Sequence, residues 1–199
     1  MKEIYLLRHG DTDATERGYY AGWMDIPLSP EGRRRILRVR EMLPQDGFRK
    51  VLVSPLKRTL ETAQIVAYGA PLEIHEALKE RSFGVWEGKG WTEIETGFPE
   101  EMRAWRRDPL HFTPPGGESF EAVLLRVATF WETFQKEPEG RYLLVTHGGV
   151  IRSLLVHLLR IDFASTFSIL LDPGVVVQFR EEGGFLQLIS LVNVEGERR

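Results

Sequence analysis

The sequence predicts an α/β fold, namely a three-layer α/β/α sandwich around a mostly parallel central sheet that carries an antiparallel hairpin at one edge. Along the 199-residue chain, short apolar runs alternate with segments of helical spacing, and this alternation is typical of strand–helix–strand units with parallel strands. Near the C-terminal end, two apolar runs at residues 175–179 and 185–189 flank the pair Gly183-Gly184. That arrangement indicates a β-hairpin.

The composition is that of an ordinary soluble globular protein, with 42% hydrophobic and 28% charged residues. The net charge of -3 disfavours general nucleic-acid binding, which needs a basic surface. There are no cysteines, so disulfides, thiol nucleophiles and thiolate metal sites are excluded. No apolar run approaches the ~18 residues of a membrane span, and the N-terminus has no signal-peptide pattern. We therefore expect a cytoplasmic protein with no nucleic-acid or membrane partner.

The first strand and the first helix are expected near the N-terminus. Residues 4–7 form a short apolar run and predict a buried strand. An irregular loop is expected over residues 11–27. Ser29 then caps a helix in which Pro30 takes the first position, and this helix runs to about residue 43. Its many arginines spread around the polar side, so we interpret them as a solvated face rather than as a nucleic-acid patch.

The second strand and helix repeat this pattern. Residues 51–53 predict a short strand. The pair Ser54-Pro55 follows at once and is again a cap with a proline behind it. It predicts a helix over residues 56–68 that starts where the strand ends.

The remaining elements follow in order. A brief strand is expected at residues 72–74, and residues 81–117 form a lid-like excursion with short helices that covers the sheet edge. Residues 118–136 carry apolar side chains at helical spacing and predict the clearest helix. A strand at residues 141–145 and a helix at residues 150–159 then precede the hairpin.

Charged and imidazole side chains follow three of the predicted strands. Arg8-His9-Gly10 follows the first, Arg58 lies in the first turn of the helix after the second, and His147 follows a later strand. Because the carboxyl ends of parallel strands meet at one edge, we expect these groups in one crevice. Two arginines and two histidines repel one another there unless an anion is bound, and a helix N-terminus adds donors for it. The pattern predicts a site that binds and attacks an anionic group.

Six short motifs make the chain resemble the histidine phosphatase superfamily, also called the phosphoglycerate mutase-like family, over nearly its whole length. Each motif is weak alone, but the six occur in the family's order. They lie at residues 7–12, 22–29, 54–63, 80–88, 115–119 and 145–149. The resemblance implies the phosphoglycerate mutase-like form of the sandwich predicted above.

The resemblance also implies roles for individual residues. His9 is the expected nucleophile, which becomes phosphohistidine, and Glu80 is expected to protonate the leaving alcohol and later to activate water. Glu87 and Glu118 remain alternatives for this acid. His147 is expected to act in catalysis as a cation beside the developing charge. The residues expected to bind the phosphoryl oxygens are Arg8, Thr15, Arg58 and His147, and those expected to contact the rest of the substrate are Ala21, Gly22 and Arg81.

The chemistry of the nucleophile adds one requirement, and the chain departs from the family at two positions. His9 must be neutral at the attacking nitrogen, so its other nitrogen is expected to donate to a fixed acceptor. The chain has Asp11 where family members usually have Glu, and Thr15 where they often have Asn. Thr15 still offers one hydrogen bond to phosphate, whereas a two-ended amide contact is lost.

We therefore predict a metal-independent phosphomonoester hydrolase that needs no cofactor and acts on a small phosphorylated metabolite, as a single domain of residues 1–199. The short excursion resembles the small phosphatase branch, with its α-ribazole phosphatase-like and broad-specificity members. Two alternatives stay open. One is a cofactor-dependent phosphoglycerate mutase, for which Arg103, Arg106 and Arg107 would supply a second anion site, and the other is a non-catalytic phosphate-binding protein. The substrate stays undetermined, and the oligomeric state is open, a homodimer included.

Overall fold

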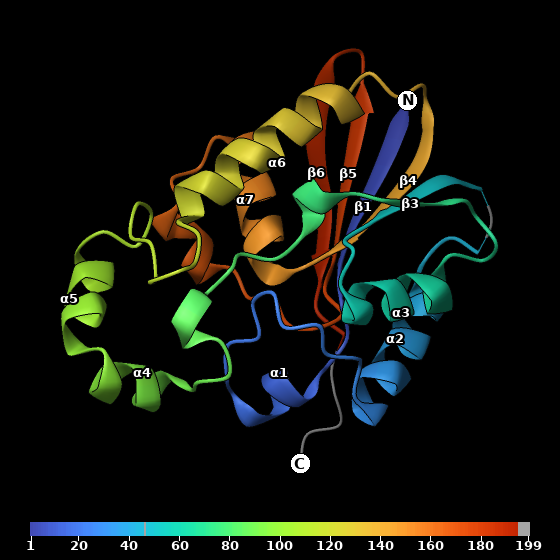
Figure 1. The fold of residues 1–199 in the computed structure, drawn as a ribbon. Coiled ribbons are helices and arrows are strands. Elements are labelled where there is room, and N and C mark those ends of the chain that lie inside the picture. Colours follow the sequence, from blue (N-terminus) through green and yellow to red (C-terminus); the bar gives the residue numbers. More distant parts are fainter. Residues whose placement is uncertain (46, 195–199) are drawn as a thin grey trace.

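A single sheet organises the fold. The computed structural model describes residues 1–45 and 47–194, so Asp46 and the last five residues of the expected domain lie outside the described part. In that part, six strands form one sheet in the order β3-β2-β4-β1-β5-β6 (Figure 1). The strands are β1 (Lys2–Arg8), β2 (Phe48–Val53), β3 (Leu72–Ile74), β4 (Gly140–Thr146), β5 (Val176–Glu182) and β6 (Phe185–Val192). The first four pair in parallel, β5 pairs antiparallel with β1, and β6 pairs antiparallel with β5, which confirms the predicted sheet with its hairpin edge.

Helices cover both faces of the sheet. α2 and α3 pack on one face, and α6 and α7 pack on the other (Figure 1). The α-helices are α1 (Asp13–Arg17), α2 (Pro30–Met42), α3 (Lys57–Val66), α4 (Trp91–Gly97), α5 (Pro99–Arg107), α6 (Phe120–Phe134) and α7 (Gly148–Leu159). Short 3₁₀ helices span Glu76–Leu78, Gly84–Trp86 and Ala164–Ser168. The predicted three-layer α/β/α sandwich is therefore confirmed.

Alternation along β1 builds the two apolar cores. Ile4 and Leu6 pack in the core on the side of α6 and α7, whereas Tyr5 and Leu7 pack in the core on the side of α2 and α3. Helices cover both faces of the sheet at β1, which lies between β4 and β5, so both faces of β1 are buried. This explains its continuous apolar sequence. The carboxyl end of β1 therefore lies in the interior of the row of strands, between β4 and β5, and not at an outer strand.

Two local predictions were wrong. The expected irregular loop contains α1, because Thr12 and Thr15 form a capping box in which each side-chain oxygen accepts a hydrogen bond from the other's backbone N–H. Ser54 does not cap α3. That helix has Leu56 at its N-cap position and no side-chain cap, because the Ser54 hydroxyl contacts another residue, described below.

The surface charges of α2 bear on the question of nucleic-acid binding. Arg33 pairs with Glu61, and Arg34 and Arg38 both pair with Glu31. These pairs support the interpretation of a solvated face rather than a basic patch. Separately, none of the described helices combines the length and the apolar composition that crossing a membrane requires.

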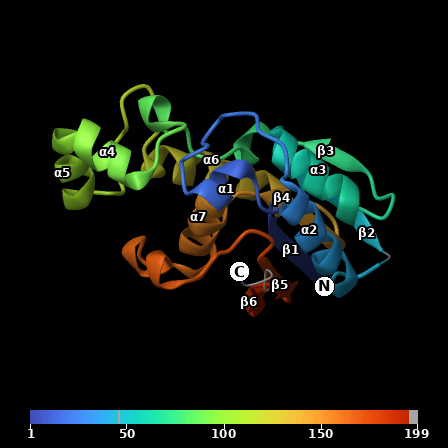
Figure 2. The ribbon, with the colours of Figure 1, turned by 90° about the horizontal axis from the view of Figure 1, so that it is seen from below.

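The lid segment, residues 81–117, has a small apolar core of its own. Trp86, Ile94 and Met102 are buried together there, and the rings of partly buried aromatic residues surround them. α4 and α5 lie at one side of the sandwich, away from the sheet, in two perpendicular views (Figures 1 and 2), so these two helices do not cover the sheet edge as expected. The segment is thus a packed unit rather than a loose connection.

Candidate active site

His9 lies directly after β1 and is held at both its backbone and its ring. Its backbone N–H donates to the carbonyl of Thr146 at 3.0 Å, and its Nδ1 lies 2.7 Å from the carbonyl oxygen of Gly10. A carbonyl only accepts, so Nδ1 carries the proton and Nε2 keeps its lone pair. Burial, together with the charges of Arg58 and Arg8, lowers the pKa of His9 well below its usual value. The ring therefore meets the requirement of a neutral imidazole whose other nitrogen donates to a fixed acceptor.

Close packing of α2 against the end of β1 requires two glycines. A Cβ on Gly10 would come within 2.6 Å of the carbonyl oxygen of Gly32 and 2.7 Å of the Ile36 side chain. A Cβ on Gly32 would come within 2.0 Å of the carbonyl oxygen of Asp11. The glycine after the histidine is thus explained by the approach of a helix to the backbone.

Two arginines accompany His9 in the site: Arg58 is buried and Arg8 is half-buried. Arg58 donates from Nη1 to the carbonyl of Met24 at 2.8 Å and from Nη2 to that of Gly22 at 2.7 Å. Burial lowers the pKa of Arg58 to about 10, so the side chain stays charged at neutral pH. Arg8 donates from Nη1 to the carbonyl of Leu171, and burial lowers its pKa too. Both guanidiniums are oriented by backbone carbonyls, and neither forms an ion pair with a carboxylate of the described residues.

Three buried nitrogens of this site have no hydrogen-bond partner within the described part of the chain. They are Nε of Arg8, Nε of Arg58 and Nδ1 of His147. Buried polar atoms are rarely left unpaired in proteins, so such a group indicates a missing partner. Two of the three are guanidinium N–H groups, which only donate, so an anion is the partner that fits them.

His147 lies at the end of β4, as the N-cap residue of α7, and its ring centroid is 5.2 Å from that of His9. Its Nε2 lies 2.7 Å from the hydroxyl oxygen of Ser54. Burial is the main cause that lowers its pKa well below the usual value, and the charge of Arg58 adds to it. The expected cationic form of His147 is therefore disfavoured in this structure.

Glu80 is the carboxylate that shares a cavity with His9. Its side chain lines a cavity of about 240 Å³ together with His9, Arg8 and Arg58. Its Oε1 accepts from the backbone N–H of Arg81 at 2.9 Å, and its Oε2 accepts from that of Gly149 at 3.3 Å. These contacts hold the carboxylate between the start of the lid segment and the start of α7.

The two alternative acids are engaged elsewhere. Glu87 accepts hydrogen bonds from the backbone N–H groups of Trp23 and Phe83. Glu118 accepts from the backbone of Ser82 and pairs with Arg126. Neither lines the cavity around His9, whereas Glu80 does.

Comparison with known proteins identifies the family. The family model described as the histidine phosphatase superfamily, branch 1, matches residues 4–194. The chain belongs to the histidine phosphatase superfamily. This agrees with the resemblance inferred from the six motifs, and it makes the chain an enzyme of the phosphatase class.

Three similar proteins illustrate the range of this superfamily. The chain is 32% identical over 174 residues to the adenosylcobalamin/alpha-ribazole phosphatase of Salmonella typhimurium, with 86% of each chain covered. It is 33% identical over 171 residues to the 2,3-bisphosphoglycerate-dependent phosphoglycerate mutase of Cytophaga hutchinsonii, covering 81% of this chain and 79% of that one. The crystal structure of the alpha-ribazole phosphatase from Shigella flexneri superposes with a TM-score of 0.87 at 28% identity, covering 99% of each chain. Phosphatases and mutases thus share this fold at similar identity.

The structure brings most of the remaining predicted residues of this histidine phosphatase to the catalytic cavity. Thr15, Ala21 and Gly22 line it. The Thr15 hydroxyl donates to the carbonyl of Thr12 at 3.0 Å, so its proton is engaged within α1. The carbonyl of Gly22 orients Arg58.

Arg81 is the exception among the residues predicted to contact the rest of the substrate. It is 1% exposed and does not line the catalytic cavity. Its guanidinium donates to the carbonyls of Glu118 and Phe112 and lies over the rings of Phe83 and Phe120. In this structure Arg81 therefore holds the lid segment to α6, and its guanidinium offers no contact to a molecule in the cavity.

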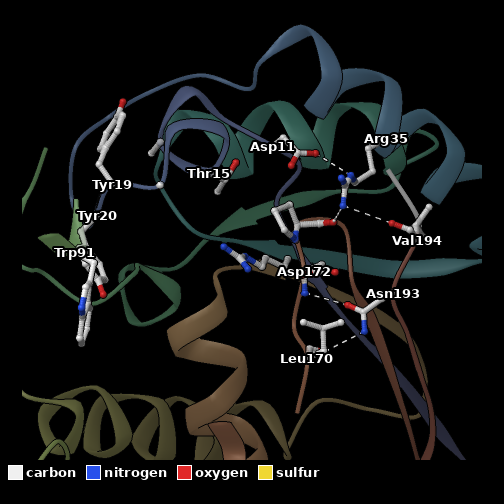
Figure 3. Close-up of a pocket in the computed structure, with 14 residues that line it drawn as sticks. Asp11, Thr15, Tyr19, Tyr20, Arg35, Trp91, Leu170, Asp172, Asn193 and Val194 are labelled. Atoms are coloured by element: carbon white, nitrogen blue, oxygen red, sulfur yellow. Dashed lines mark hydrogen bonds and ion pairs between the residues drawn. The ribbon is translucent and has the colours of Figure 1, made fainter. Parts of the chain in front are cut away.

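A second cavity of about 820 Å³ opens beside the first, and the two share Arg8, Ala14, Thr15, Tyr19 and Tyr20 as lining residues. Figure 3 shows Tyr19, Tyr20 and Trp91 on one side of this cavity and Asp172 and Asn193 on the other. The residues of the latter wall are not among those predicted from the sequence. Nothing in the local sequence marks Asp172 or Asn193, which lie in segments before β5 and after β6.

Contacts among distant segments form that wall. Asn193 accepts from the backbone N–H of Asp172 at 2.9 Å and donates to the carbonyl of Leu170 at 3.0 Å. Arg35 of α2 lies 2.8 Å from Asp11 and donates to the carbonyl of Pro173 at 3.0 Å (Figure 3). Asp11, the departure from the family pattern, thus forms an ion pair that ties the segment after β1 to α2, and the same arginine ties α2 to the segment before β5.

Proposed function

We propose that this histidine phosphatase hydrolyses phosphate monoesters of small metabolites through a phosphohistidine intermediate on Nε2 of His9, without a metal ion. The observation that carries the proposal is the ring geometry of His9. Its Nδ1 proton is held by the carbonyl of Gly10, so the lone pair of Nε2 is available beside two guanidiniums and one carboxylate. A positioned neutral imidazole of this kind is an activated nucleophile.

The first step transfers the phosphoryl group to the enzyme. The Nε2 lone pair of His9 forms a bond to phosphorus, and the bond from phosphorus to the ester oxygen breaks. The leaving oxygen takes a proton from the protonated carboxyl group of Glu80. Arg8 and Arg58 stabilise the charge on the phosphoryl oxygens, since such transfer is catalysed mainly by positioning and electrostatic stabilisation.

The second step releases inorganic phosphate. Water attacks phosphorus on the side that the alcohol has left, and the carboxylate of Glu80 accepts a proton from that water. The bond from phosphorus to Nε2 breaks, and the electron pair returns to the imidazole of His9. Glu80 then carries the proton with which the cycle started, so the two steps balance. Splitting the transfer into two steps lowers the barrier of each.

The alcohol part of the substrate is proposed to lie in the adjoining cavity. Its volume of about 820 Å³ is within the range of small-molecule sites. Aromatic side chains of Tyr20 and Trp91 offer flat apolar contacts, and Asp172 offers a hydrogen-bond acceptor (Figure 3). Ala21 and Gly22, at the catalytic cavity, would contact the atoms next to the phosphoryl group.

Ion pairing in the lid segment favours hydrolysis over the mutase alternative. A mutase that retains a bisphosphate needs cations for the second anion. Arg103 pairs with Glu100 and Arg106 pairs with Glu95. Two of the three arginines that were candidates for a second anion site are thus already paired with carboxylates.

The wider setting of the enzyme is proposed from the sequence. We infer that residues 1–199 act as one domain whose lid segment faces the substrate. We further infer a cytoplasmic enzyme that binds a small phosphorylated substrate and neither nucleic acid nor membrane. Self-association into a homodimer stays a prediction.

The test is an assay of two activities on the same preparation. Phosphate release is measured from p-nitrophenyl phosphate and a panel of phosphate monoesters with EDTA present. Conversion of 3- to 2-phosphoglycerate is measured with bisphosphoglycerate added. We expect hydrolysis that EDTA does not reduce, and isomerisation far slower than hydrolysis. Isomerisation that exceeds hydrolysis would favour the mutase, and the absence of both activities would favour a binding protein.

A further inference from the structure

The Ser54 hydroxyl contacts the ring of His147, the second histidine of the site. Both residues are fully buried, and the Ser54 hydroxyl oxygen lies 2.7 Å from Nε2 of His147. The backbone of Ser54 is fixed at the end of β2: its N–H donates to the carbonyl of Val145 at 3.1 Å, and its carbonyl accepts from the hydroxyl of Thr59 at 2.9 Å. The hydroxyl is therefore a fixed partner for the imidazole.

The proton of this hydroxyl has one acceptor. Ser54 Oγ makes a single hydrogen bond within the described part of the chain, and its partner is Nε2 of His147. If Nε2 carried a proton, the hydroxyl proton would be buried with no acceptor, at the desolvation cost of that group. If Nε2 is unprotonated instead, the hydroxyl donates to it, and the ring proton lies on Nδ1.

The other ring nitrogen points to the same assignment. Nδ1 of His147 belongs to the group of three unpartnered nitrogens, with Nε of Arg8 and Nε of Arg58. A bare lone pair on Nδ1 would repel an anion bound by these guanidiniums, whereas an N–H there would donate to it.

We propose that Ser54 is a positioning residue: it donates its hydroxyl proton to Nε2 of His147 and so holds that ring as the neutral tautomer with its proton on Nδ1. His147 then presents an N–H to the phosphoryl group as a neutral donor rather than as a cation. The tautomer follows from the hydrogen bonds alone, and its role in phosphoryl transfer rests on the proposed function.

The charges around His147 support a neutral ring. Burial and the nearby groups Arg58, His9, Arg8 and Arg126 all lower the pKa of His147. A neutral donor also keeps the same protonation state through both steps of the reaction. Glu80 is then the one group that has to take up and release a proton.

Nitrogen-15 NMR of histidine-labelled enzyme tests the tautomer directly. Long-range proton–nitrogen correlations distinguish a protonated ring nitrogen from a bare one, and the signals of His147 are assigned by their loss in His147→Gln. At pH 7 we expect a protonated Nδ1 and a bare Nε2, both in the resting enzyme and with vanadate added. A ring protonated on both nitrogens, or on Nε2 alone, would overturn the proposal. Neither spectrum depends on which substrate the enzyme uses.

Substitution of Ser54 supplies a second test with a matched control. Ser54→Ala should give a mixture of His147 tautomers and lower kcat for p-nitrophenyl phosphate on the order of 10-fold. Ser54→Thr keeps the hydroxyl, so it should show the single tautomer and the kcat of the wild-type enzyme. Ser153→Ala removes another fully buried hydroxyl, one that donates to the carbonyl of Gly149 at 3.0 Å, and should leave the His147 spectrum unchanged. A Ser54→Ala enzyme with the wild-type kcat and tautomer would contradict the assignment. If Ser54→Ala does not fold, the wild-type spectra still decide.

Discussion

The ends of β1 and β4 look alike in sequence and differ in chemistry. Both read as an apolar strand followed by histidine and glycine, and the strands are parallel neighbours with Arg8 opposite Thr146. At the end of β1, a backbone carbonyl holds Nδ1 of His9. At the end of β4, a serine side chain holds Nε2 of His147. In the proposed function the first ring offers a lone pair and the second an N–H, so the same motif yields a proposed nucleophile at one strand and a proposed donor at the other.

Separate substitutions of His9 and His147 should distinguish these two roles most clearly. His9→Ala removes the attacking lone pair, so turnover of p-nitrophenyl phosphate should fall by several powers of ten, on the scale of ~10⁵. Vanadate binding, measured by calorimetry, should persist because Arg8 and Arg58 remain. His147→Gln should weaken vanadate binding and lower turnover less, by about 10² to 10³. Equal losses of rate in the two variants would contradict the comparison.

The next largest effect is expected at Glu80, which accepts a hydrogen bond from the backbone N–H of Gly149, shortly after the end of β4. Glu80→Gln removes the proton donor and should lower turnover by about 10² to 10⁴. The loss should be larger for alkyl phosphates than for p-nitrophenyl phosphate, whose leaving group needs less protonation. Glu118→Gln is the matched control, since Glu118 lies outside the catalytic cavity. A similar loss for both leaving groups would argue against Glu80 as the acid.

Two adjacent glycines at the start of α7 allow a finer test of the β4 side. A Cβ on Gly149 would come within 2.3 Å of Oε1 of Glu80, whereas a Cβ on Gly148 would lie 3.5 Å from the nearest atoms of Arg8. Gly149→Ala should thus displace the carboxylate and lower kcat on the order of 10- to 100-fold. Gly148→Ala should have a smaller effect. Thermal unfolding of both variants shows whether the fold is kept, and equal kcat values would indicate that the position of Glu80 is not critical.

The smallest expected effect is on the pH dependence of the free energy of unfolding, to which both histidine rings contribute. The pKa values of His9 and His147 are lowered in the folded state, whereas the unfolded chain protonates near 6.5. Below pH 6.5 the unfolded state binds protons that the folded state does not, so the free energy of unfolding should fall with pH from about 6.5 down to the folded-state values. Urea unfolding between pH 7.5 and 5.5 measures this slope. His9→Ala should make the slope shallower, and an unchanged slope would contradict a neutral, buried His9.

Much of the site could be predicted because its residues follow strands. Arg8, His9 and His147 come directly after apolar runs, and Arg58 comes in the first turn of the helix after β2, so the parallel sheet brings them together. The predicted sandwich and hairpin have the same origin in apolar periodicity. The short helix α1 was missed because its capping residues, Thr12 and Thr15, lie in a segment with no apolar stripe.

Other features depend on where a side chain points after packing, which local sequence does not encode. Arg81 follows Glu80 directly, yet its guanidinium is directed into the lid segment and not into the cavity. Ser54 has the sequence context of a helix cap, and its hydroxyl instead contacts His147 across the sheet edge. Asp172 and Asn193 meet at the adjoining cavity only because the segments before β5 and after β6 lie side by side.

The most direct test of the account is to trap the covalent intermediate. Wild-type and Glu80→Gln enzyme are mixed with p-nitrophenyl phosphate, quenched in base within milliseconds, and digested for mass spectrometry. We predict a burst of nitrophenol close to one equivalent of enzyme in Glu80→Gln, together with phosphohistidine at Nε2 of His9. Turnover without a burst and without phosphohistidine, or a phosphoryl group on any other residue, would contradict the assignment of His9 as the nucleophile.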